Sequence, residues 1–126
     1  MSKVVVDTIE DRSAAETVDA ADLVHGSIKC WGNIDGTGTP SYDDSYNCSS
    51  LTDNGTGKYA LHLTNAMSDA NYASVYGGHY PDGGMNGMVS SGDTVSASVL
   101  STAWSDRANA LTDETYYTAA ILGVLA

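Results

Sequence analysis

Short runs of alternating apolar and polar residues, separated by glycine-rich turns, constrain the fold of this chain more than any other feature. An apolar run that contains Trp31 enters a turn at residues 35–39, and a second run reaches Asp53-Asn-Gly-Thr-Gly57. Alternation then resumes at Tyr59, Leu61 and Leu63. A period of two sends successive side chains to opposite faces of a strand, and Asn-Gly and Gly-rich turns join the strands of a hairpin. The sequence therefore predicts β-hairpins, with Trp31 in the core or an interface near the Tyr59 row.

The same pattern continues to the end of the chain, with further turn signals at Asp82-Gly83-Gly84 and Gly92-Asp93. Residues 102–112 are predicted to form a loop or a single helical turn. Closely spaced short strands predict an all-β fold, an antiparallel sandwich or jelly-roll-like domain that spans residues 25–126. The expected strands are residues 27–34, 45–51, 58–64, 72–80, 85–90, 94–101 and 115–125.

The first 24 residues differ from the rest and are predicted to form an N-terminal attachment arm, extended or partly helical. Residues 3–10 are rich in β-branched side chains and favour a strand or an extended arm. Ser13-Ala-Ala-Glu16 matches a capping box, and Gly26 could end a helix that begins there. Thr17-Val-Asp19 fits an extended chain equally well, so a short helix and an irregular linker both remain open.

The charge of the chain excludes one class of partner. Sixteen acidic side chains against five basic ones give a formal net charge of −11. Binding to a phosphate backbone depends on Lys and Arg, so no nucleic acid is expected as a partner. The same charge disfavours direct contact with an anionic bacterial surface unless cations or uncharged sugars mediate it. Its simpler role is solubility.

Neither a membrane span nor a zinc site is predicted. No basic, apolar signal segment opens the chain, and the longest apolar run, residues 119–126, is far shorter than the roughly 20 residues that a span requires. We therefore expect a soluble protein made in the cytosol.

Cys30 and Cys48 flank the first hairpin turn and could meet across it. A reducing cytosol favours buried free thiols over a disulfide there.

No catalytic residue, cofactor or resident metal is predicted, and an enzyme is not expected. The acidic residues near the turns lack the spacing of a calcium loop, so solvated turn carboxylates are the simpler explanation, and a calcium ion shared between subunits is the alternative. The histidines are isolated, and His62 is expected to face away from the core row. A Gly-x-Ser-x-Gly elbow is also missing. The residues considered were Asp35, Asp43, Asp44, Asp53, His25, His62 and His79.

A tyrosine-rich segment offers the best candidate for a binding site. Tyr72, Tyr76 and Tyr80 are four residues apart and share one face of a predicted strand, and the glycines between them allow a bulge. Aromatic rings with hydroxyl tips serve carbohydrate and protein recognition. We therefore predict a binding site at Tyr72, Tyr76, His79 and Tyr80. Packing within the domain or between subunits is the simpler alternative.

Three segments together resemble a module of tail fibres and related appendages in tailed phages. They are Trp31-Gly-Asn-Ile-Asp-Gly-Thr-Gly-Thr39, Ser49-Ser-Leu-Thr-Asp-Asn-Gly-Thr-Gly-Lys-Tyr59 and Thr64-Asn-Ala-Met-Ser-Asp-Ala-Asn-Tyr72. The resemblance covers roughly residues 25–80. The chain departs from the typical sequence of this module at five positions. It has Cys30, Gly32, Ile34 and Asp35 in place of Ala, Val, Phe and Asn, and Ser68 in place of Pro.

The resemblance implies a β-rich virion protein, usually trimeric, with no catalytic residue. The expected function is that of a tail fibre or similar appendage that assembles as a homotrimer and contributes to attachment to the host surface. The N-terminal arm would bind other virion proteins, and a host-surface glycan or protein is the candidate receptor. The expected location is the virion, after synthesis in the host cytoplasm. The alternative is a capsid or tail decoration protein that binds no receptor, and a polysaccharide or cell-wall hydrolase is a weaker third possibility.

Overall fold

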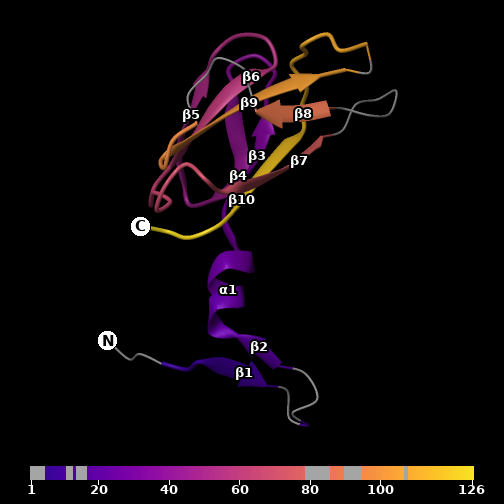
Figure 1. Ribbon diagram of the computed structural model, residues 1–126. Helices are drawn as coiled ribbons and strands as arrows, with labels where there is room; N and C mark the ends of the chain where they lie inside the picture. The colour runs from indigo at the N-terminus through magenta and orange to yellow at the C-terminus, as the bar shows by residue number, and fades with distance from the viewer. Residues whose placement is uncertain (1–4, 11–12, 14–16, 79–85, 90–94, 107) are drawn as a thin grey trace.

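The computed structural model describes residues 5–10, 13, 17–78, 86–89, 95–106 and 108–126, and for residues 86–89 it describes the backbone alone. Short strands dominate this part of the chain, with one helix near the N-terminus (Figure 1). The elements are β1 (Thr8–Glu10), β2 (Thr17–Asp19), α1 (Ala20–Gly26), β3 (Ile28–Asp35), β4 (Ser41–Tyr46), β5 (Cys48–Asp53), β6 (Lys58–Leu63), β7 (Ala73–Gly78), β8 (Asn86–Val89), β9 (Val99–Ser105) and β10 (Tyr117–Leu122).

Two four-stranded antiparallel sheets form the body of the molecule. One has the strand order β4-β3-β10-β7 and the other β5-β6-β9-β8. The sheets pack face to face, so that β4 lies beside β5 at one side and β7 lies beside β8 at the other. This arrangement confirms the predicted all-β antiparallel sandwich. Both predicted hairpins, β3–β4 and β5–β6, are present.

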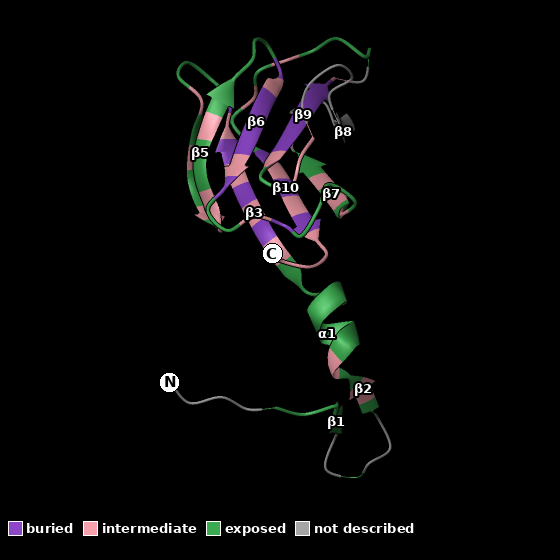
Figure 2. Ribbon diagram, turned by 60° about the vertical axis from the view of Figure 1, so that its left-hand side comes forward, coloured by how far each residue is buried: buried purple, intermediate pink, exposed green. Residues whose placement is uncertain are grey.

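The core is built from aromatic rings that carry polar tips, because the chain contains no Phe. The ring of Tyr117 stacks on Trp104 with centroids 4.9 Å apart and lies 5.6 Å from the ring of Tyr59. All three residues are fully buried. The predicted row of Tyr59, Leu61 and Leu63 is confirmed as part of this core. Figure 2 shows buried residues on β3, β6, β9 and β10, the central strands of the two sheets, and none on α1.

Trp31 does not join this core, and its predicted packing near Tyr59 was wrong. The buried residues of β3 are Cys30, Gly32 and Ile34, so Trp31 lies half-buried on the opposite, outer face of the sheet. Gly32 is required on the inner face, because a Cβ there would lie 2.7 Å from a ring carbon of Tyr42. The small inner residues let the second layer approach, and the large Trp31 side chain is left outside.

Two predicted boundaries also differ from the structure. The expected strand 45–51 is divided at Asn47, whose φ of 58° turns the chain from β4 in one sheet to β5 in the other. Its side-chain amide donates to the carbonyl oxygens of Lys29 and Asn65, and this fixes the crossover. The expected boundary between the strand 94–101 and the loop 102–112 was wrong, because the strand β9 begins only at Val99, continues to Ser105 and includes the buried Trp104.

The N-terminal arm projects from one end of the sandwich (Figure 1). It consists of the antiparallel pair β1–β2 followed by α1, and α1 has no buried residue. The helix begins after Asp19, whereas the predicted capping box began at Ser13; residues 14–16 lie outside the described part of the chain. Both predicted features of the arm, extended chain and a short helix, are therefore present in different segments.

Replacing Trp104 by Ala should cost about 3–5 kcal/mol of the free energy of unfolding, because it leaves a large cavity among the core rings. Trp31→Ala is the matched control and should cost about 1–2 kcal/mol, since that side chain is only half-buried. Urea unfolding followed by circular dichroism measures both values. Equal losses in the two variants would contradict the assignment of Trp31 to the outer face.

Candidate functional site

The two described residues of the predicted tyrosine site, Tyr72 and Tyr76, pack against the core. The hydroxyl of Tyr72 donates to the carbonyl oxygens of Val99 at 3.0 Å and Ser96 at 3.2 Å. The ring of Tyr76 meets Trp104 edge-on, with centroids 5.7 Å apart. Both rings therefore have a packing role. The other two predicted residues, His79 and Tyr80, lie outside the described residues, and ligand binding by the four stays a prediction.

Within the described part of the chain, the hydroxyl of Tyr76 is buried and has no hydrogen bond of good geometry, although the Ser74 hydroxyl lies nearby. Burial raises the pKa of Tyr76. A buried hydroxyl usually has a partner, because an unpaired one costs about 1–3 kcal/mol. Tyr76 is thus oriented by its ring contacts rather than by a polar anchor.

The acidic residues at the turns stabilise those turns, because their carboxylates accept hydrogen bonds from the turn residues. Oδ1 of Asp53 accepts a hydrogen bond from the backbone N–H of Gly55 at 2.8 Å, and Asp69 does the same for Asn71 at 2.7 Å. Asp35 accepts from both the N–H and the hydroxyl of Thr37, and these bonds lower the pKa of Asp35. This is the behaviour of Asx-turns.

No group of three potential metal ligands exists among the residues that the structure describes. The imidazole of His62 lies on the outer side of β6, with Nε2 2.9 Å from the hydroxyl of Thr52, which confirms that it faces away from the core row. His25 lies in the last turn of α1. The described histidines are thus far apart in the chain and belong to different elements.

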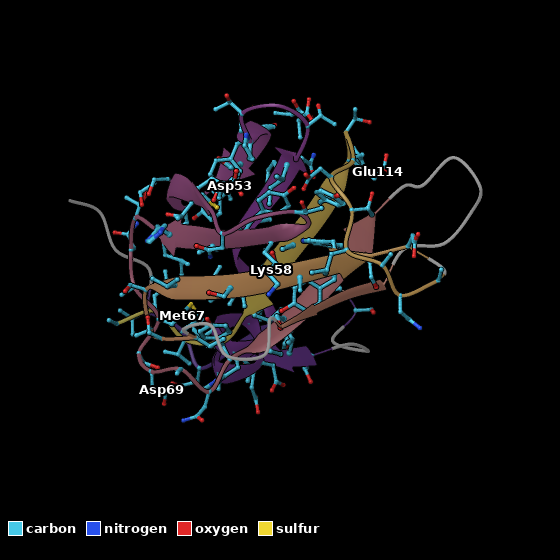
Figure 3. All side chains as sticks on the ribbon, turned by 90° about the horizontal axis from the view of Figure 1, so that it is seen from above. Asp53, Lys58, Met67, Asp69 and Glu114 are labelled. Atoms are coloured by element: carbon cyan, nitrogen blue, oxygen red, sulfur yellow. The ribbon has the colours of Figure 1, made fainter. Side chains whose placement is uncertain are left out.

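One end of the sandwich carries a group of loops that buried hydrogen bonds join together; we call residues 36–40, 54–57 and 108–116 the distal loops. Oδ1 of Asp113 accepts from the N–H of Gly57 and from the hydroxyl of Tyr59, both at 2.6 Å. The N–H of Gly36 donates to the carbonyl oxygen of Glu114 at 2.8 Å. Figure 3 shows Asp53 and Glu114 toward this side and Met67 and Asp69 toward the other. The distal loops are therefore a cross-linked surface rather than separate tips.

The outer face of the β4-β3-β10-β7 sheet carries a straight apolar row that the sequence analysis missed. Tyr46, Trp31, Ala120 and Val75 are cross-strand neighbours in register, one from each strand; we call them the outer row. Tyr46 is 56% exposed and Val75 is 57% exposed. A signal was present in the sequence, since Trp31 shares its face of the strand with the polar Lys29 and Asn33.

The next row on this face is polar or small and consists of Asp44, Asn33, Thr118 and Gly77. The hydroxyl of Thr118 donates to Oδ1 of Asn33 at 3.1 Å. An exposed apolar stripe with a polar border has the composition of a contact surface between proteins.

Comparison of the chain with protein-family models, curated proteins and solved structures gives no match. In the part of the chain that the structure describes, no helix has the length and apolar character needed to cross a membrane.

Replacing Tyr72 by Phe should weaken the alkaline loss of stability. Burial raises the pKa of Tyr72 to about 12, from an ordinary value of 10.0. The unfolded chain therefore releases this proton near pH 10, whereas the folded chain keeps it, so stability is full below pH 10 and falls as the pH rises toward 12. Between pH 10 and pH 12 the unfolding free energy of Tyr72→Phe should therefore fall less steeply with pH. The difference in slope corresponds to the release of up to one proton.

Urea unfolding at intervals from pH 8 to pH 12 measures that slope. Below about pH 9 the wild type and Tyr72→Phe should have the same slope, because the phenol of Tyr72 keeps its proton there in both the folded and the unfolded chain. Identical slopes in the wild type and Tyr72→Phe above about pH 10 would mean that the phenol of Tyr72 is accessible to water in the folded state.

Proposed function

We propose that this chain is a structural, non-enzymatic subunit of a tailed-phage virion, a tail-fibre-like appendage that contributes to attachment to the host surface. The observation that carries the proposal is the polarity of the molecule. The arm leaves one end of the sandwich at Gly26, and the distal loops lie at the opposite end (Figure 1). A subunit that joins a particle by one end and meets a surface with the other needs such a division.

The roles of the module residues in the fold support this interpretation. A Cβ on Gly36 would lie 2.2 Å from the hydroxyl oxygen of Tyr59. Gly57 has a φ of 64°, and a Cβ there would collide with the carbonyl oxygen of Trp104. Met67 is 1% exposed. Each of these residues shapes the sandwich or its distal loops, as expected of a module that serves as a scaffold and carries no catalytic group.

We further propose that the chain assembles as a homotrimer through the outer row. The apolar C-terminal run, residues 119–126, offers little surface for this contact, because it includes the second half of β10, which β3 and β7 pair on both sides. The outer row offers apolar surface instead, since Tyr46 is 56% and Val75 57% exposed. Three subunits would present three sets of distal loops, so weak contacts with a repeated surface glycan or protein would add up through effective concentration.

Self-association through the outer row predicts that Val75→Glu gives a monomer, whereas the wild-type protein is a trimer by light scattering at micromolar concentration. A carboxylate in an apolar contact loses hydration without gaining a partner. Ser50→Glu adds the same charge to an exposed position of the other sheet and should leave the trimer intact. A wild-type monomer at all concentrations would refute self-assembly, although assembly onto a partner would remain open.

Virion incorporation tests the proposed function itself. Phage whose own copy of the gene is inactivated are complemented with the full chain or with a chain that lacks residues 1–26. The purified particles are then probed by immunogold labelling. The truncated protein should keep the melting curve of the sandwich but be missing from the particles, because the arm provides attachment. The full chain with Thr39→Ala in a distal loop is the control and should be incorporated normally.

Gold on tails supports an appendage, whereas gold on heads would favour the alternative of a decoration protein. Absence of the full-length protein from purified particles would refute the virion proposal. Normal incorporation of the truncated protein would transfer attachment to the sandwich and reverse its proposed orientation.

A further inference from the structure

The two cysteines face each other across the interior of the sandwich. Cys30 lies on β3 in one sheet, and Cys48 is the first residue of β5 in the other. Their Sγ atoms are 3.1 Å apart, about 1 Å more than the length of a disulfide bond. Both thiols are free. The folded chain therefore holds two sulfurs from opposite layers at a separation that a small movement can close.

The two thiols differ in access and in acidity. Cys30 is 0% exposed, whereas Cys48 is only half-buried and its sulfur also lies 3.2 Å from the carbonyl oxygen of Trp31. The hydrogen bond from Cys30 lowers the pKa of Cys48 and raises that of Cys30, and burial raises the pKa of Cys30 further. Cys48 is therefore the thiol that both meets an oxidant and carries the thiolate.

We propose that Cys30 and Cys48 form a disulfide between the two sheets when the protein meets a disulfide oxidant such as oxidised glutathione. This inference rests on the geometry of the pair and is independent of the proposed function. Free thiols are expected during synthesis in a reducing cytosol, so the bond would form after the chain reaches an oxidising medium.

The reaction proceeds by two thiol–disulfide exchanges. The thiolate of Cys48 attacks one sulfur of oxidised glutathione, which forms a mixed disulfide and releases one glutathione thiolate. The thiol of Cys30 then loses its proton to the medium and attacks the sulfur of Cys48, which releases the second glutathione. The two cysteines are oxidised by two electrons, and one glutathione disulfide is reduced to two thiols.

The bond would join the layers near the end of the sandwich that carries the arm. It would enclose residues 30–48, which contain all of β4 and the crossover at Asn47. A covalent loop of this length restricts the unfolded chain more than the folded one. The disulfide form should therefore be clearly more stable to heat than the dithiol form.

The full-length protein is incubated with oxidised glutathione, and thiols are counted with a chromogenic disulfide reagent after denaturation. We expect both thiols to disappear, the intact mass to fall by about 2 Da, and a peptide map to join Cys30 to Cys48 within one chain. The melting temperature should rise by roughly 10 °C and return after treatment with dithiothreitol. Two thiols that still react, or a link between different chains, would overturn the proposal.

Two single variants test the order of attack. In Cys30→Ala the reaction should stop at a stable glutathione adduct on Cys48, because no second thiol resolves it. In Cys48→Ala the buried Cys30 should remain unmodified, and the melting temperature should not respond to the oxidant. Rapid modification of Cys30 in Cys48→Ala would show that the inner thiol is accessible and would refute the proposed order.

Discussion

The core of this protein is built by burying aromatic rings that carry polar tips, and those tips need hydrogen-bond partners. Without Phe, the chain fills its centre with Tyr59, Tyr117 and Trp104, and each brings a hydroxyl or an N–H into the interior. Such groups are costly unless they are paired. The hydroxyl of Tyr59 donates to Asp113, that of Tyr117 donates to the carbonyl oxygen of Thr112, and the indole N–H of Trp104 donates to Thr102.

These pairs connect the core to the distal loops. Asp113 and Thr112 belong to the loop after β9, so satisfying two tyrosines also fixes that loop. Gly36 and Gly57 complete the arrangement, since a side chain at either position would collide with the groups that make these contacts. Gly36 and Gly57 are thus explained by the closure of one end of the sandwich. A surface fixed in this way would lose little conformational entropy in binding a partner.

Strand β3 links the features that matter for the proposed function. Its inner residues Cys30, Gly32 and Ile34 are small or aliphatic and admit the second layer, and Cys30 thereby reaches Cys48. Its outer residue Trp31 belongs to the exposed apolar row proposed for assembly. The arm enters the sandwich immediately before this strand. The proposed assembly, the proposed attachment and the proposed disulfide therefore all depend on the position of β3.

The all-β class, the two hairpins and the buried row of Tyr59, Leu61 and Leu63 could be predicted from the sequence, because a period of two and glycine turns are local properties. The sequence also placed Tyr72 and Tyr76 on one face. The packing of the two layers is what turns this face inward, turns Trp31 outward and brings Cys30 to Cys48. Alternation separates the two faces of a strand, but where both carry apolar residues it does not say which one the opposite layer covers.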